Sequence, residues 1–285
     1  MTLARRPLLL SLLGATLGCG RRAEAPVTRE LAPEDLLPSS LDVVVRVDVG
    51  KLRRALPDMG ELSRQAAARE DDEARAKLVD AVATRGRELW IGARDRAFGD
   101  LVVAATGDFD ELDLGPSFTQ IEQSATERVF ERRDAARDAP AWVLLRPRAL
   151  VAATPAMTDA VARARARGLP SAHDVPRDTA LGISVRARAL VGDAAAQRAP
   201  FSSMRLADGS LDIEGGLLRG TLRATFTTEE HAEHAARVAG ALVERARAGA
   251  SGALLDGVEI TRKSSARVVM TVKIPAAALR RALGR

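Results

Sequence analysis

Four segments of the chain share one layout: a short run of alternating apolar residues, a break, and an alanine-leucine start typical of a helix. VRVDVGKLRRAL at 45–56 and VKIPAAALRRAL at 272–283 are identical at six of twelve positions. Weaker copies are ISVRARALVGDA at 183–194 and VLLRPRALVAA at 143–153. Chance similarity in an arginine- and alanine-rich chain is the alternative for any one match. Four matches in corresponding order favour an internal duplication.

The elements around these segments predict an α+β fold of two similar lobes, each with the order β-α-β-β-α-β-β-α. LDVVVRVDV at 41–49 alternates with a period of two, as a strand with one buried face does. Helices are predicted at 61–84, between Pro147 and about Arg167, and at 227–248, while Gly215-Gly216 marks a hairpin. Hairpins favour a mostly antiparallel sheet in each lobe, covered by helices on one face. The predicted units are a first lobe at 41–167, a linker at 168–178 and a second lobe at 179–285.

Residues 1–18 have the features of a secretory signal peptide. Arg5 and Arg6 precede an uncharged, mostly apolar run from Leu8 to Gly18. A helix that crosses a membrane needs about 20 apolar residues, so this run is too short to span one. The sequence therefore predicts an exported protein.

TLGC at 16–19 resembles the lipobox of bacterial lipoprotein precursors, in which signal peptidase II cuts before a lipidated cysteine. The resemblance implies cleavage between Gly18 and Cys19, lipid attachment at Cys19, and a membrane partner reached through that lipid. Residues 19–40 would then form the lipidated cysteine and a flexible tether. In related bacteria an Asp after the cysteine retains lipoproteins in the inner membrane, so Gly20 favours the outer membrane. An ordinary cleaved signal, with Cys19 as a single thiol, is the alternative.

The charge pattern argues against nucleic acid as a ligand. Lys and Arg number 43 against 38 Asp and Glu, and aromatic residues, on which bases would stack, make up 3% of the chain. Cations on the polar phase of the predicted strands could form an outward face for anionic lipid, polysaccharide or an envelope protein. An ordinary solvated sheet face is the alternative. These cations are Arg46, Arg186, Arg219, Arg223 and Lys273.

The motifs predict no catalytic residue, no metal site and no cofactor. Glu230, His231 and His234 lie within one helical turn, but they match neither zinc-protease spacing and are explained by a helix N-terminus. The acids within 107–115 lack the glycine and distal glutamate of an EF-hand. Gly-x-Ser-x-Gly, Walker and dinucleotide motifs do not occur. His173 lies in the predicted linker, where a catalytic histidine would be poorly held.

The sequence therefore favours a non-enzymatic cell-envelope lipoprotein that acts as a binding or scaffold module. Beyond the lipobox, its duplicated layout resembles uncharacterised exported lipoproteins of GC-rich bacteria such as myxobacteria, which implies an envelope location and no particular activity. A ligand-carrying lipoprotein with an apolar or basic cleft between the lobes is the second hypothesis. A hydrolase assembled from scattered carboxylates is the third.

Overall fold

The computed structural model describes residues 32–55, 59–68, 70–94, 99–167, 173, 175–247, 257–263 and 266–275. By its contacts the chain divides into Met1–Glu30 and Leu31–Arg285, and the elements below belong to the second unit. The predicted signal peptide, Gly18, Cys19 and most of the predicted tether lie outside the described residues. Within the described ranges, no helix is both long enough and apolar enough to cross a membrane.

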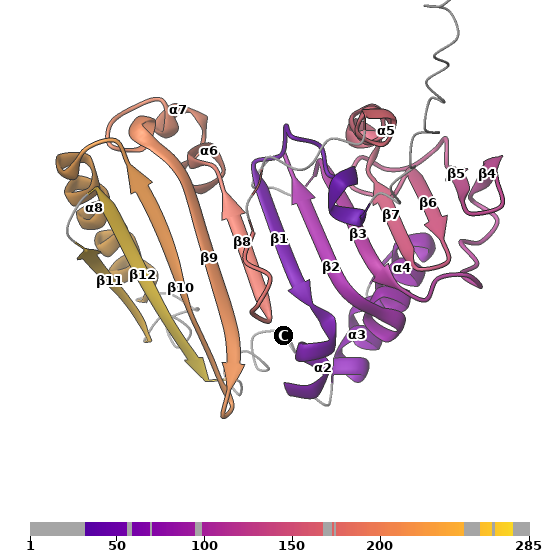
Figure 1. The fold of residues 1–285 in the computed structure, drawn as a ribbon, viewed down its shortest axis with the longest axis horizontal. Coiled ribbons are helices and arrows are strands. Elements are labelled where there is room, and N and C mark those ends of the chain that lie inside the picture. Colours follow the sequence, from indigo (N-terminus) through magenta and orange to yellow (C-terminus); the bar gives the residue numbers. More distant parts are fainter. Residues whose placement is uncertain are drawn as a thin grey trace, which may run out of the picture. The chain divides into compact units, whose positions relative to one another are not determined.

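Twelve strands form a single sheet, and all neighbouring strands in it run antiparallel (Figure 1). The strands are β1 (Val43–Asp48), β2 (Gly86–Ala93), β3 (Leu101–Gly107), β4 (Thr119–Gln123), β5 (Arg128–Glu131), β6 (Trp142–Arg146), β7 (Ala149–Ala153), β8 (Leu181–Val185), β9 (Met204–Glu214), β10 (Leu217–Phe226), β11 (Val258–Lys263) and β12 (Arg267–Pro275). Their order across the sheet is β11-β12-β10-β9-β8-β1-β2-β3-β7-β6-β5-β4.

The strands β1 and β8 form the seam of the sheet, with Val45 opposite Ile183. We call β1 to β7 with their helices the first half, and β8 to β12 with theirs the second half. Outward from the seam, the first half runs β1-β2-β3-β7-β6 and the second runs β8-β9-β10-β12-β11, while β5 and β4 extend the first half further. The two halves therefore share one continuous sheet.

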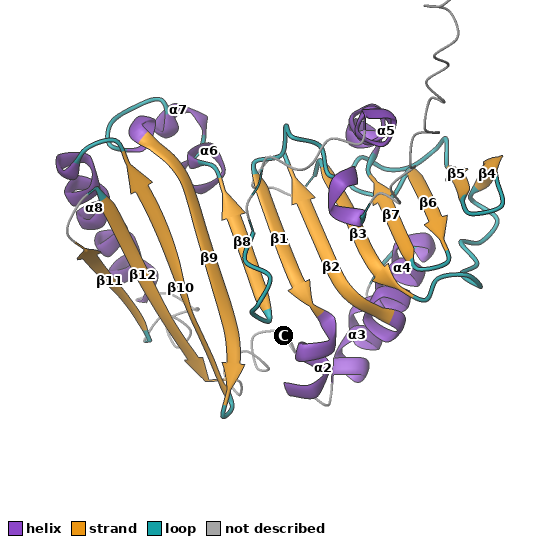
Figure 2. Cartoon of the chain, viewed as in Figure 1, coloured by secondary structure: helices purple, strands orange, loops and turns teal. Residues whose placement is uncertain are grey.

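Helices connect the strands and flank the sheet (Figure 2). The first half contains the 3-10 helices η1 (Pro33–Leu36) and η2 (Pro155–Met157) and the α-helices α2 (Val49–Ala55), α3 (Met59–Ala68), α4 (Glu73–Arg85) and α5 (Thr158–Arg167). The second half contains α6 (Ala187–Val191), α7 (Asp193–Ala196), η3 (Phe201–Ser203) and α8 (Glu229–Arg247).

Both faces of the sheet are covered in the first half. On β7, Leu150 packs in one cluster with Leu78 of α4, while its neighbour Val151 packs in another with Leu36 of η1 and Val161 of α5. Successive strand residues point to opposite faces, so these helices lie on opposite sides, which we call the α4 face and the η1 face. The prediction that helices cover one face is therefore wrong for this half.

The helix α8 covers the α4 face of the second half. Val43, Val185 and Ala207 lie opposite one another on consecutive strands, and Ala207 packs with Ala232 and Ala235 of α8. Figure 1 shows α8 behind the strands of this half, so the side facing the viewer is the η1 face. On that face, β9, β10 and β12 present alternate polar side chains.

Two elements of the first half differ from the sequence prediction. ALVAA at 149–153, expected to begin a helix, is the strand β7, paired between β3 and β6. An unbroken apolar run suits a central strand buried on both faces as well as a helix. The predicted helix at 61–84 is two helices, because Asp72 caps α4 by accepting a hydrogen bond from the backbone N–H of Arg75 at 2.9 Å.

The strand β4 ends the sheet on the side of the first half, and the sequence analysis did not predict it. All five of its residues are exposed. The pairing with β5 shifts register between Gln120 and Glu122, which leaves Ile121 without an opposite residue and 46% exposed. Such a bulge twists an edge strand and interrupts its row of hydrogen-bonding groups.

Candidate ligand cavity and polar sheet face

A cavity lies in the first half, between the α4 face of the sheet and the helices α2 and α4. Its volume is about 640 Å³, within the range of pockets that hold small molecules. Aliphatic side chains dominate its wall, which is lined by Val47, Val49, Leu52, Leu78, Val79, Val82, Ala83, Leu89, Ile91, Leu101, Val103, Pro140, Leu150, Ala152 and Ala153, with Arg75, Asp138 and Thr154.

The apolar lining results from the two-residue alternation of the strands and the 3.6-residue period of α4. Val47, Ile91 and Val103 lie on three adjacent strands and point to the same face, with Val45 opposite Ile91 and Ile91 opposite Val103. Leu78 and Val82 stand one helical turn apart on α4 and line the opposite wall. Protein interiors are close-packed, with few voids larger than a water molecule, so a space of this size is a pocket and not a packing gap.

The polar groups of the cavity are paired. Arg75 lies 2.6 Å from Glu70 and 3.1 Å from Asp138, and its side chain is 37% exposed against 63% for that of Asp138. The hydrogen bond to Glu70 raises the pKa of Arg75 above its ordinary value, so the guanidinium stays charged. The hydroxyl of Thr154 accepts a hydrogen bond from the backbone N–H of Leu101 at 2.9 Å. The cavity thus has a charged, solvent-facing end and an apolar interior.

The structure separates the five cations of the predicted anionic-ligand face. Arg46 is buried at the seam, where it pairs with Glu88 and donates to the carbonyl of Thr179 at 3.0 Å. Arg186 donates to the carbonyl of Ser39 at 3.0 Å. The other three share the η1 face of the second half, where Arg219 on β10 lies opposite Lys273 on β12 and Arg223 lies 4.0 Å from Asp208 on β9.

The sequence candidates for metal binding lie at a capped helix end and in a turn. The hydroxyl of Thr228 accepts a hydrogen bond from the backbone N–H of His231 at 3.2 Å, and Glu233 pairs with Arg237 at 2.9 Å. In the turn after β3, Asp113 accepts a hydrogen bond from the backbone N–H of Gly115 at 2.9 Å. Within the described ranges, no group of three or more His, Cys, Asp and Glu residues is placed to hold a metal ion.

His173 is held more firmly than its linker position suggested. It is 8% exposed, and its Nδ1 and Nε2 each lie 2.9 Å from a partner, the hydroxyl of Ser184 and the carbonyl of Leu41. A carbonyl only accepts, so Nε2 carries the proton and Nδ1 accepts from Ser184. Burial lowers the pKa of His173 below its ordinary value and keeps the ring neutral. The ring therefore joins the chain before β1 to β8 across the seam.

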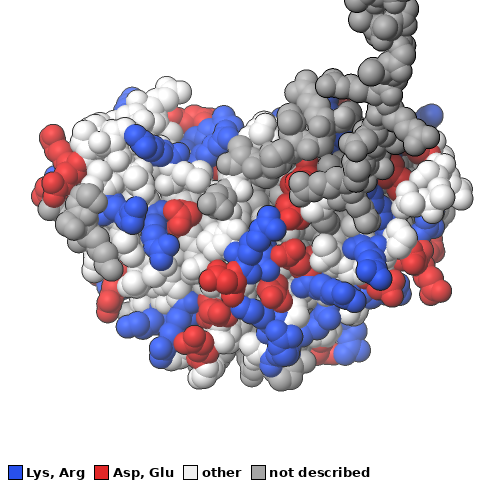
Figure 3. Space-filling model, in the orientation of Figure 1, with Lys and Arg blue, Asp and Glu red and all other residues white. Residues whose placement is uncertain are grey.

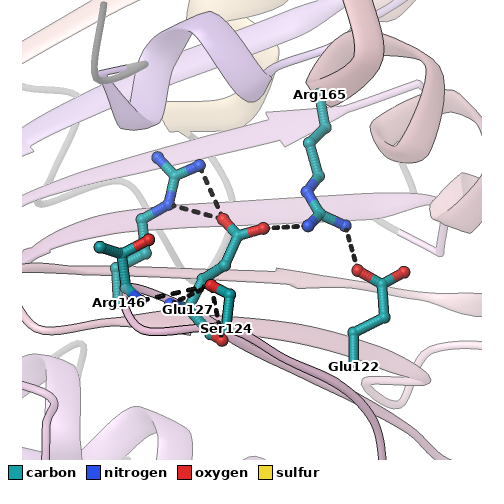
Figure 4. A network of polar contacts seen from close by, with 6 residues as sticks. Glu122, Ser124, Glu127, Arg146 and Arg165 are labelled. Atoms are coloured by element: carbon teal, nitrogen blue, oxygen red, sulfur yellow. Dashed lines mark hydrogen bonds and ion pairs between the residues drawn. The ribbon is translucent and has the colours of Figure 1, made fainter. Parts of the chain in front are cut away.

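A second polar cluster, not predicted from the sequence, joins β6, the hairpin before β5 and α5 (Figure 4). Glu127 accepts hydrogen bonds from Arg146 at 3.1 Å and also pairs with Arg165, which reaches Glu122 at 3.0 Å. Burial alone would raise the pKa of Glu127, but the hydrogen bonds from Arg165 and Arg146 outweigh it and lower that pKa. The cluster fastens the edge hairpin to α5.

The comparisons with known proteins concern the fold. No protein-family model matches the chain, and no curated protein matches it by sequence. Among solved structures, crystal form I of TP0453 superposes with a TM-score of 0.52 at 12% identity, covering 87% of this chain and 94% of that chain. Form III gives 0.51 at 11% identity with 87% and 96% covered, and form IV gives 0.51 at 11% identity with 90% and 97% covered. At this identity the likeness shows a shared fold alone.

Proposed function

We propose that this chain is a lipid-anchored protein of the bacterial envelope that binds an apolar ligand in the cavity beneath α4 and does not catalyse a reaction. The observation that carries the proposal is the cavity itself, about 640 Å³ in volume and lined almost entirely by aliphatic side chains. It lies inside the first half, whereas the sequence analysis placed a ligand cleft between the lobes.

The lining indicates the class of ligand. An aliphatic chain that leaves water for this cavity gains about 0.8 kcal/mol per buried methylene, and the interior has no unpaired polar group to favour a polar ligand. Because Arg75 and Asp138 are partly exposed at one end, a polar end group would lie beside them. Among the described residues that line the cavity there is no histidine, serine or cysteine, and the one carboxylate, Asp138, is paired with Arg75; both features support binding without catalysis.

The test of the cavity is binding of a fluorescent fatty-acid analogue to the full chain in nonionic detergent. Val103→Phe and Val79→Phe should fill the cavity and weaken binding at least tenfold, with the melting temperature unchanged or raised. Leu242→Phe is the matched control, because Leu242 is exposed on α8 and lines no part of the cavity. Unchanged binding by both filled variants, or no binding by the parent protein, would refute the proposal.

The envelope anchor is a separate part of the proposal and depends on Cys19. Cys19→Ser should abolish incorporation of labelled fatty acid and partitioning into the detergent phase, whereas Ala25→Ser should change neither. A Cys19→Ser protein that stays equally membrane-bound would place the anchor elsewhere. That result would leave the cavity proposal untouched.

We also infer that the two halves descend from one duplicated unit. Support comes from their strand orders outward from the seam, β1-β2-β3-β7-β6 and β8-β9-β10-β12-β11, in which each position has a counterpart. Along the chain, the first half has β4 and β5 between β3 and β6, whereas the second half has α8 between β10 and β11. In this alignment the counterpart of β12 is β7 and not β6. Superposition of the two halves in an experimental structure tests the inference, and strands that fail to coincide in this order would refute it.

A further inference from the structure

The η1 face of the second half carries three rows of side chains, all polar except Val269, that cross β9, β10 and β12 in register. One row is Asp212, Arg219 and Lys273, and the next is Ser210, Thr221 and Thr271. The third is Asp208, Arg223 and Val269. Residues directly opposite on antiparallel strands point to the same face with Cβ atoms about 5 Å apart, so the members of each row are neighbours.

Arg219, Lys273 and, at the other end of β12, Arg267 are cations of this face without an ion pair among the described residues. Arg223 has Asp208 at 4.0 Å, and Asp212 lies 3.9 Å from Lys51 while its other oxygen accepts from the backbone N–H of Ile213 at 3.0 Å. Within the described part of the chain, the side chains of Arg219 and Lys273 make no hydrogen bond and no ion pair. Arg219 lies between Lys273 and Asp212 in its row, so the repulsion from the like charge on one side is offset in part by the opposite charge on the other.

Arg219 and Lys273 line a shallow groove of about 390 Å³ that also contains the hydroxyl row. Its described lining also includes Thr179 and the carboxylates of Asp212 and Glu214, and contains no aromatic side chain. Arg, Lys and Thr are the donors that proteins commonly use for phosphate: the guanidinium binds two oxygens side by side, the ammonium acts as a point charge, and the hydroxyl donates a further bond.

We propose that Arg219 and Lys273, with the hydroxyl of Thr221, bind the phosphate group of a small soluble molecule; the hydroxyl of Thr271 already donates to the carbonyl of Glu259 at 3.4 Å. An extended anionic surface such as a bilayer fits less well, because Asp208, Asp212 and Glu214 share this region of the face. Figure 3 shows acidic and basic side chains interspersed on the side that carries this face. The groove itself is lined by two cations and two carboxylates, a balance that disfavours an extended anionic surface more than a single anionic group held by Arg219 and Lys273. The site is separate from the apolar cavity.

The experiment is calorimetric titration of the full chain, in nonionic detergent, with glycerol 3-phosphate and with inorganic phosphate. The parent protein should bind at least one of the two saturably, and Arg219→Gln and Lys273→Gln should each weaken that binding about tenfold or more. The matched control is Arg223→Gln on the same strand and face, which should change the affinity less than twofold because Arg223 already faces Asp208. Equal losses in all three variants, or no binding of either probe, would overturn the proposal.

Two further measurements separate the site from its rivals. Without phosphate, Arg219→Gln should leave the melting temperature nearly unchanged, because it removes both the repulsion from Lys273 and the attraction to Asp212; a clear decrease would assign Arg219 a structural role and overturn the proposal. Adding phosphatidylglycerol to the micelles should leave the affinity for glycerol 3-phosphate within twofold. Loss of that binding would show that a lipid headgroup occupies the groove, and would overturn the assignment to a soluble ligand.

Discussion

At the scale of single residues, the described polar side chains mainly connect parts of the fold through hydrogen bonds and ion pairs. His173 illustrates this, because both ring nitrogens are engaged and its partners belong to the chain segments on either side of the seam. Burial lowers its pKa, the bond to Leu41 and the nearby Asp42 act in the opposite direction, and Arg186 lowers it further. A charged ring at this position would lose the hydrogen bond that Nδ1 accepts from Ser184.

The first prediction concerns this histidine and pH. The folded pKa lies below the unfolded value of about 6.5, so the unfolded chain takes up a proton first as the pH falls. The free energy of unfolding should therefore be fully retained above pH 6.5 and decrease below it, by up to about 1.4 kcal/mol per pH unit, until the folded pKa is reached. Urea unfolding at several pH values measures the slope. In His173→Gln this slope should vanish between pH 6.5 and 5.5, and a slope identical to that of the parent would assign it to other groups.

At the scale of elements, the cap of α4 connects stability to the proposed binding site. Asp72 accepts from the backbone N–H of Arg75 and also pairs with Arg132, and α4 forms one wall of the cavity. Burial alone would raise the pKa of Asp72, but the bonds from Arg75 and Arg132 outweigh it and lower that pKa. The carboxylate thus stays ionised at neutral pH.

Asp72→Ala should lower the free energy of unfolding by about 1–2 kcal/mol, the usual loss on removing a cap, and should weaken binding of the fluorescent probe. Asp72→Asn keeps a capping oxygen without the charge, so its loss should be smaller. Urea unfolding followed by circular dichroism measures both variants. If the two lose equal stability, the pair with Arg132 matters more than the cap.

The alternation of apolar residues was enough to predict the antiparallel strands of the second half, and the long amphipathic pattern at 227–248 predicted α8. ALVAA at 149–153 was misassigned because an apolar run has the same composition in a buried helix and in a central strand. The cavity could not be predicted, since its wall combines Val47, Leu78, Val103 and Leu150 from elements far apart in the chain. The neighbouring positions of Arg219 and Lys273 likewise depend on strand register, which no local pattern reports.

At the scale of the whole described unit, the halves are joined by pairing of β1 with β8 and by polar contacts across that seam. Arg46 contacts Glu88 on β2 and the carbonyl of Thr179 just before β8, and Arg188 pairs with Asp42. A buried arginine whose partners come from both halves favours their unfolding together, because separation would leave its charge without partners.

The third prediction is that the halves unfold in one cooperative step. The chain contains two tryptophans, Trp90 and Trp142, which are 3% and 4% exposed and both belong to the first half. Tryptophan fluorescence therefore reports the first half, while far-ultraviolet circular dichroism reports both. The two urea transitions should coincide. A fluorescence transition displaced from the dichroism transition would show that the halves unfold independently.

The bulge in β4 affects how readily a second copy of the molecule can add a strand to this edge of the sheet. A sheet of twelve strands with a flat, regular edge would offer its free N–H and C=O groups as a template for the next molecule, and a membrane would concentrate such edges in two dimensions. With Ile121 displaced from the pairing and Glu122 beside it, the β4 end presents a broken row that a second strand cannot follow in register. The irregular edge thus hinders growth of the sheet by addition of neighbouring copies at the β4 end.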